Sequence, residues 1–134
     1  MSVTEALLQL QVEAAQYPDA VRTWMMVMAA SFFAGVLFTP WYHGARWVVV
    51  IMLATAAGLV VAKMFLPEVS RADSGTFIHL ALWPFALLSL WICRPAAGPA
   101  LRTRVYVAWS LWVSLLMLVS LAMDAFRFAR MVLG

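Results

Sequence analysis

The sequence has little charge, a single cysteine and no cluster of basic residues. Only 11% of its 134 residues are charged, against about 25% in soluble domains, whereas 66% are hydrophobic. A chain this short has too few polar groups to cover a globule that faces water. The scarcity of charge therefore excludes a soluble domain and indicates the lipid bilayer as the solvent.

Several kinds of chemistry lack the residues that they need. The lone Cys93 excludes an intrachain disulfide and a cysteine-pair metal site, and two histidines with one cysteine are a poor ligand set. We expect His43 and His79 at opposite membrane faces, so a bis-histidine haem would need His79 from two protomers. There is no phosphate-binding glycine loop, nucleophile elbow or H-E-x-x-H motif. The sequence thus predicts no enzyme activity, no metal and no cofactor.

What the sequence does have is four apolar segments long enough to cross a hydrocarbon core of about 30 Å. Lipid cannot satisfy open backbone groups and no strand-like alternation is present, so these segments should be helices. Four prolines lie in the short connections, as expected of residues that cannot continue a helix, namely Pro40, Pro67, Pro95 and Pro99. The predicted spans are residues 24–39, 47–66, 76–92 and 105–123, with room for the last helix to continue to residue 132.

A different kind of helix is predicted before the first span, over residues 3–17. Ser2 and Glu5 have the spacing of a capping box. Glutamates and glutamines then form one stripe and leucines, valines and alanines the other, so the helix is amphipathic. Its apolar face would either dock on a partner subunit or lie at the membrane interface. It has no Lys or Arg with which to bind anionic lipid.

These elements make the predicted fold all-α. It is an integral membrane bundle of four transmembrane helices with an N-terminal amphipathic interfacial helix, in a single domain of residues 1–134. Four spans return the chain to its starting face, so both termini are expected on the same side of the membrane. Expected partners are the bilayer, further copies of the chain or other membrane subunits. Because the basic residues are scattered, no nucleic-acid partner is expected.

Small residues four apart indicate faces where two spans could approach closely. The second span offers Ala54, Gly58 and Ala62, and the first span offers Ala30 and Ala34. Two interpretations stay open. These faces would either join the first two spans to each other, or mediate a contact between protomers.

Four ionisable residues are expected to gather at one mouth of the bundle. In an up-and-down bundle the second span ends, the third begins and the fourth ends on one side. Ionisable groups within spans should face the bundle or a wet cavity and pair. The expected cluster consists of Lys63, His79, Asp124 and Arg127. Arg127 is the local partner of Asp124, with Lys63 or His79 as a second. In the structural alternative, Lys63 snorkels to the headgroups and Asp124 lies just outside the hydrocarbon.

Pro84 lies within the third span and is predicted to kink it. Its ring leaves the carbonyl of Leu80 without a helical donor. Trp83 stands one turn after His79 on the same side. A kink there would open a small polar notch, which is tolerated when it is buried in protein or wet. The alternative is that this proline has no special role, because prolines are common in membrane helices.

Two short stretches carry a resemblance. The pattern H-x3-W-P that ends at Pro84, and S-L-x2-D-x2-R that ends at Arg127, resemble short bacterial four-helix membrane proteins of no assigned function. The resemblance covers the last two spans and implies no activity. It implies a protein of the bacterial inner membrane.

The sequence as a whole favours a homo-oligomeric channel or a transporter-like pathway for an ion or small solute. The polar cluster at one mouth would be pH-sensitive, because histidine can change charge close to physiological pH. The alternative is a non-catalytic accessory or scaffold subunit of a larger membrane complex. Such a subunit would bind its partners through the N-terminal helix and the small-residue faces.

Overall fold

A computed structural model describes residues 1–96 and 98–134. Within these residues the chain is all-helical, with 83% of it in helices and no strand. The elements in chain order are α1 (Val3–Ala15), α2 (Asp19–Ala34), the 3-10 helix η1 (Gly35–Phe38), α3 (His43–Phe65), α4 (Arg71–Ile92) and α5 (Leu101–Leu133).

Four of these helices are long and apolar enough to cross a membrane. They are α2 together with η1, then α3, α4 and α5, with mean hydropathies between 1.6 and 2.3 over their most apolar segments. The prediction of an all-helical chain with four such segments is confirmed. The helices extend beyond the predicted spans at several ends, most of all α5, which reaches Leu133.

Local signals in the sequence set several helix boundaries. The predicted capping box of α1 is present, because the Ser2 amide donates to the Glu5 carboxylate at 2.7 Å and the Glu5 amide donates to the Ser2 hydroxyl at 3.2 Å. Ser70 caps α4 in a similar way by accepting from the amide of Asp73. Pro84 lies inside α4, which continues as one helix to Ile92.

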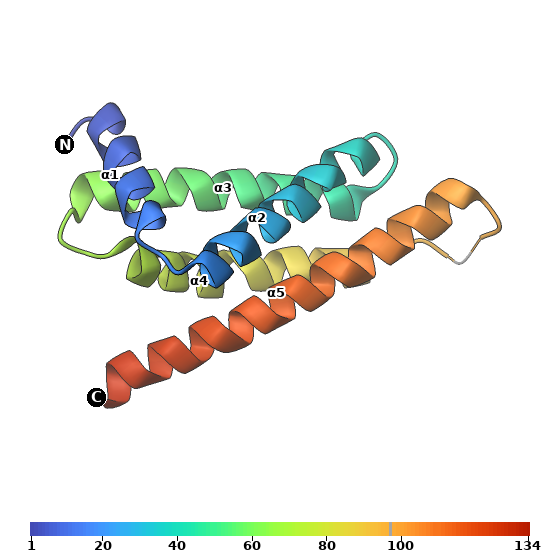
Figure 1. Cartoon of the computed structure of the whole chain (residues 1–134). Helices are drawn as coiled ribbons and strands as arrows, with labels where there is room; N and C mark the ends of the chain where they lie inside the picture. The colour runs from blue at the N-terminus through green and yellow to red at the C-terminus, as the bar shows by residue number, and fades with distance from the viewer. Residues whose placement is uncertain (97) are drawn as a thin grey trace.

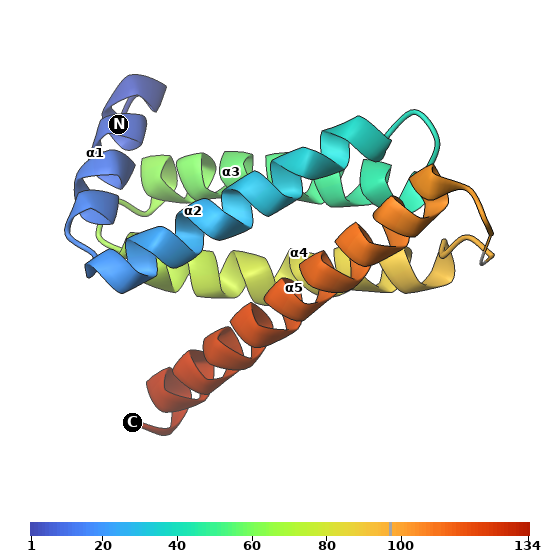
Figure 2. The same ribbon diagram turned by 45° about the vertical axis from the view of Figure 1, so that its right-hand side comes forward.

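The helices are arranged around an α3–α4 hairpin. Figures 1 and 2 show α3 and α4 lying side by side along their length, with α2 and α5 crossing them at an angle. The α3–α4 contact is the most extensive in the chain, followed by that between α4 and α5. By contrast, α2 contacts α3 and α5 only sparsely. Both chain ends lie at the end of the bundle where α3 stops and α4 begins (Figure 1), and we call this the terminal end.

The opposite end of the bundle is filled by aromatic rings. Tyr42 and Tyr106 stack with their centroids 3.9 Å apart, and Phe38 packs against Tyr106 and Trp109. Gly44 allows this packing, because a Cβ there would lie 2.6 Å from the Tyr106 hydroxyl oxygen. The aromatic rings of this end therefore pack tightly against one another.

The small residues of the first two spans do not face each other. A Cβ at Gly58 would meet Ile78 of α4 at 3.3 Å, and both Ala30 and Ala54 are exposed. The physical reason is that α3 lies along α4, so Gly58 at the centre of its small face falls against that helix. Ala34 and Ala62 are half-buried.

The first span approaches α5 closely at Gly35. A Cβ at this position would lie 2.6 Å from the Trp109 ring. The indole of Trp109 donates to the carbonyl of Ser31 at 2.8 Å, and the indole of Trp112 donates to the Ser31 hydroxyl at 2.9 Å. Two tryptophans of α5 are thus attached to one turn of α2.

Candidate functional site: a pocket with one polar end

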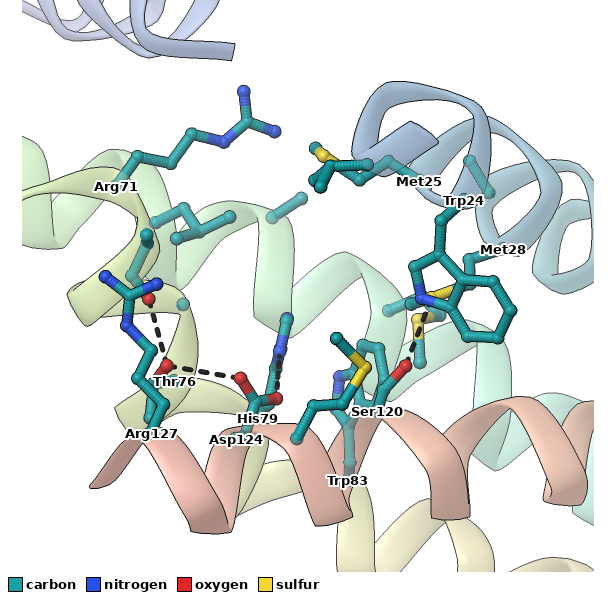
Figure 3. A pocket seen from close by; sticks show the side chains of 18 of the residues that line it. Trp24, Met25, Met28, Arg71, Thr76, His79, Trp83, Ser120, Asp124 and Arg127 are labelled. Carbon is teal, nitrogen blue, oxygen red and sulfur yellow. Dashed lines mark hydrogen bonds and ion pairs between the residues drawn. The ribbon is translucent and has the colours of Figure 1, made fainter. Parts of the chain in front are cut away.

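A pocket of about 990 Å³ lies between α2 and α5, with α3 and α4 behind it. Trp24, Met25 and Met28 of α2 face across it toward α4 and α5 (Figure 3). Phe33 and Phe126, which also line it, are exposed on the outside of the helices. The pocket therefore opens sideways, onto the apolar outer surface of the bundle.

The polar end of the pocket is built around His79 and Asp124. The Nδ1 atom of His79 lies 2.9 Å from Oδ2 of Asp124, and the Thr76 hydroxyl donates to Oδ1 of the same carboxylate at 3.1 Å (Figure 3). The side chains of His79 and Asp124 are 23% and 17% exposed. Both carboxylate oxygens thus have a donor, and the pair stays in contact with the pocket.

The ring of His79 is held from its other side by a chain of contacts. It lies against the Trp83 ring with the centroids 4.0 Å apart. The Trp83 indole donates to the Thr55 hydroxyl at 3.1 Å, and that hydroxyl donates to the Ile51 carbonyl at 2.8 Å. The position of His79 is therefore fixed by α3 and α5 as well as by its own helix α4. Pro84 is the next residue after Trp83 in the sequence.

Arg127 pairs with a different carboxylate from the predicted one. Its Nε and Nη2 atoms donate to one oxygen of Asp73 at 3.1 and 2.8 Å. The other oxygen of Asp73 accepts from the Ser70 hydroxyl at 2.8 Å. Asp73 is fixed at the first turn of α4 and presents its carboxylate to α5. Asp124 is less available to Arg127, because its carboxylate is already bonded to His79 and Thr76.

Lys63 also differs from its predicted place. It does not line the pocket, and its side chain is only 3% exposed, so it does not snorkel to the surface. Its ammonium group forms an ion pair with Glu13 and donates to the carbonyls of Pro67 and Val69 at 3.1 and 2.9 Å. Of the four residues expected together, the structure brings His79 and Asp124 into contact, places Arg127 beside them and separates Lys63.

Glu13 joins α1 to the hairpin. Besides Lys63, its carboxylate accepts from the backbone amide of Arg71 at 2.6 Å, and the Arg71 guanidinium donates to the Leu10 carbonyl at 2.9 Å. Burial alone would raise the pKa of Glu13. The bonds from Lys63 and Arg71 together lower the pKa by more than burial raises it, so the net shift is downward. We call Glu13, Lys63 and Arg71 the α1 clasp.

Sequence reasoning missed several of these polar residues. Glu13 fell on the polar stripe of an amphipathic helix, where a solvated side chain is the usual interpretation. Asp73 had a usable signal, because it follows Ser70 at capping-box spacing. Thr55 and Thr76 gave none, since a hydroxyl in an apolar helix usually bonds to its own backbone. Within the described residues no three His, Cys, Asp or Glu side chains gather closely enough to hold a metal ion.

The chain matches no protein-family model, no curated protein and no solved structure. A function therefore has to be inferred from the geometry and chemistry of the pocket itself.

Proposed function

We propose that this chain is an integral membrane protein and that the pocket between α2 and α5 is the solute chamber of a transporter-like pathway. The observation that carries the proposal is one pocket of about 990 Å³ that joins apolar walls to the His79–Asp124 pair. Ligand sites are usually concave and mostly apolar, with a few convergent polar groups, and range from about 300 to 1,000 Å³. All walls of this chamber come from one chain.

Membrane insertion is supported by what the helices expose. Four helices have the length and hydropathy to cross a bilayer, and their outer surfaces carry large apolar side chains such as Phe33, Phe65 and Phe85. Cysteines introduced at Ser2 and Gly134 in a Cys93→Ser background test the topology. Both should react with a membrane-impermeant reagent from the same side, whereas labelling from opposite sides would contradict the four-span arrangement.

The blocked opposite end favours a transporter-like pathway over a permanently open pore. The packed rings of Tyr42, Tyr106 and Trp109 separate the pocket from that end of the bundle. A solute in the chamber therefore has access from the terminal end and the side only. Passage to the far side would require the helices to move, as alternating access does.

The His79–Asp124 pair is the proton-responsive element of this proposal. With Nδ1–H directed at the carboxylate, an added proton goes to Nε2 and raises the charge of the pair by one. The charged groups around the pair are Arg71 and Asp73 of α4, with Arg127 and Arg130 of α5. The pocket walls from α2 and α3 carry no charged side chain, and Tyr17 just before α2 is their only titratable neighbour among the described residues. One proton therefore alters the charge balance of the chamber.

Flux measurements in liposomes test the proposal. The wild type, His79→Ala and Asp124→Asn proteins would be reconstituted around a proton-sensitive dye and compared between about pH 5 and pH 8. We expect the wild type to give a proton flux above that of empty liposomes. This proton flux should depend on pH, and both variants should lose that dependence. His43→Ala is the matched control, because His43 lies at the start of α3, away from the terminal end, and does not line the pocket. Equal flux in every variant would contradict the site, and no flux above empty liposomes would contradict the pathway.

A second candidate is the accessory subunit, and one observation favours it. Helix α1 buries Ala6 and Leu10 against the bundle but exposes Leu7, Leu8 and Val12. An amphipathic helix attached to its own chain by one apolar edge and exposing another is suited to a partner subunit. Purification in a mild detergent tests this function, because a stoichiometric second polypeptide that is lost in a Leu8→Gln variant would favour it over the transporter-like pathway.

A further inference from the structure

We propose that the pocket between α2 and α5 binds an anionic amphiphile drawn from the bilayer, with one acidic head group and a linear apolar chain. The inference rests on the proposed role of the pocket as a ligand chamber and names the class of ligand.

The charge of the lining selects an anion. Three guanidinium groups line the pocket, from Arg71, Arg127 and Arg130, against two carboxylates, from Asp73 and Asp124. Asp73 is engaged by Arg127, and both oxygens of Asp124 have donors. No carboxylate in the lining is thus left for a cationic ligand, whereas the positive charge exceeds the negative.

The surplus positive charge belongs to Arg71 and Arg130. Arg71 donates to a backbone carbonyl, that of Leu10, and Arg130 lies over the Phe126 ring at 5.6 Å. Among the described residues neither guanidinium lies within ion-pair distance of a carboxylate. Glu13 interacts electrostatically with Arg71, but its carboxylate is already paired with Lys63. Arg71 is half-buried and Arg130 is exposed, and a guanidinium can bind an acidic head group through two parallel charge-assisted hydrogen bonds.

The apolar part of the pocket suits a linear chain rather than a compact solute. Its α2 wall runs from Val21 to Phe33, a separation of twelve residues or about 18 Å of helix at about 1.5 Å per residue. Phe33, Leu53 and Met123, which line the pocket, are themselves exposed on the outer surface. A ligand could therefore enter sideways from lipid, with its chain along α2 and its head at the arginines of the terminal end.

Binding of palmitate tests the charge. The full chain would be placed in nanodiscs of phosphatidylcholine, and radiolabelled palmitate would be displaced by hexadecanol or by hexadecyltrimethylammonium. We expect saturable palmitate binding. Hexadecanol should displace the label at least tenfold more weakly than unlabelled palmitate does, and the ammonium compound should not displace it at the same concentration. Arg130→Gln, alone and with Arg71→Gln, should weaken palmitate binding at least tenfold. Arg102→Gln is the matched control, because Arg102 also lies over an aromatic ring, that of Trp41, at the other end of the bundle. Hexadecanol binding as tight as palmitate would overturn the charge assignment.

A pair of neighbouring substitutions tests the location. Ala56 lines the pocket and Ala57 does not, although both are exposed on α3. Ala56→Trp should abolish palmitate binding, and Ala57→Trp should leave it unchanged. Palmitate binding by Ala56→Trp, or a second copy of the chain that fills the pocket and is lost with this substitution, would overturn the proposal. Palmitate binding without flux would contradict only the transport function, and flux without palmitate binding would contradict only the ligand class.

Discussion

Glu13 of α1 and Lys63 of α3 form an ion pair in which the lysine side chain is 3% exposed and the glutamate side chain 23%. The carbonyls of Pro67 and Val69 provide two further acceptors, so all three ammonium protons have a partner. A buried charge is expensive unless it is fully satisfied. The pair therefore attaches α1 to the turn between α3 and α4 and makes α1 a cover for the terminal end.

Replacing Glu13 with Gln should destabilise the protein. The variant leaves the buried ammonium of Lys63 with neutral acceptors only and no counter-charge. We expect the free energy of unfolding to fall by about 1–3 kcal/mol, measured by denaturant titration in dodecyl maltoside. Glu68→Gln is the matched control, because Glu68 is exposed and should stay within about 0.5 kcal/mol of wild type. Equal stability of the two variants would mean that the carbonyls alone satisfy Lys63.

The same carboxylate should make the stability depend on pH in the acid range. Burial raises the pKa of Glu13, but the bonds from Lys63 and Arg71 lower it more, so the folded-state pKa lies below the unfolded one. The ionised carboxylate therefore stabilises the fold above the unfolded pKa, and this contribution is lost as pH falls through the folded pKa. We expect the difference in melting temperature between wild type and Glu13→Gln to be constant near neutral pH and to close in acid. A difference that persists at the lowest pH would show that charge is not its cause.

Thr55→Val should destabilise the protein although the two side chains have the same shape. The Trp83 side chain, in a residue that is 2% exposed, donates its indole N–H to the Thr55 hydroxyl. A buried donor without an acceptor costs about 1–3 kcal/mol. Thr55→Ser keeps the hydroxyl and should recover most of that loss. If Val and Ser were equally stable in denaturant titrations, the indole bond would contribute nothing.

Gly35→Ala should be more destabilising than Gly58→Ala. A Cβ at position 35 would lie 2.6 Å from the Trp109 ring, which its bond to the Ser31 carbonyl holds in place. We expect a loss of about 1–3 kcal/mol from this overpacking. A Cβ at position 58 would meet only the flexible tip of Ile78 at 3.3 Å, and alanine is a better helix former than glycine.

Melting temperatures of the two alanine variants test this order. A Trp109→Phe background should reduce the loss at Gly35, because it removes the contacting ring edge. Gly58→Ala as the more damaging change would show that the face of α3 predicted from small-residue spacing controls packing after all.

The part of the site that could be anticipated is the part that follows from topology. His79 and Asp124 meet because helices that alternate in direction bring the start of α4 and the end of α5 to one level. Arg127 has two carboxylates within reach, and only the rotation of α5 against α4 decides between Asp124 and Asp73. The pocket itself had no signal in the sequence, because it arises where α2 contacts its neighbours sparsely.

The helical structure and the four apolar helices of membrane length follow from the order of the amino acids alone, because hydrophobicity and the hydrogen bonding of the backbone act along the chain. The capping box of α1 follows from the sequence in the same way, because it is a contact between residues three apart. The partner of Lys63, the neighbour of Gly58 and the existence of the pocket depend instead on how the helices pack. These depend on helix rotation and crossing angle, which the packing of large side chains sets and which leave no periodic trace in the sequence.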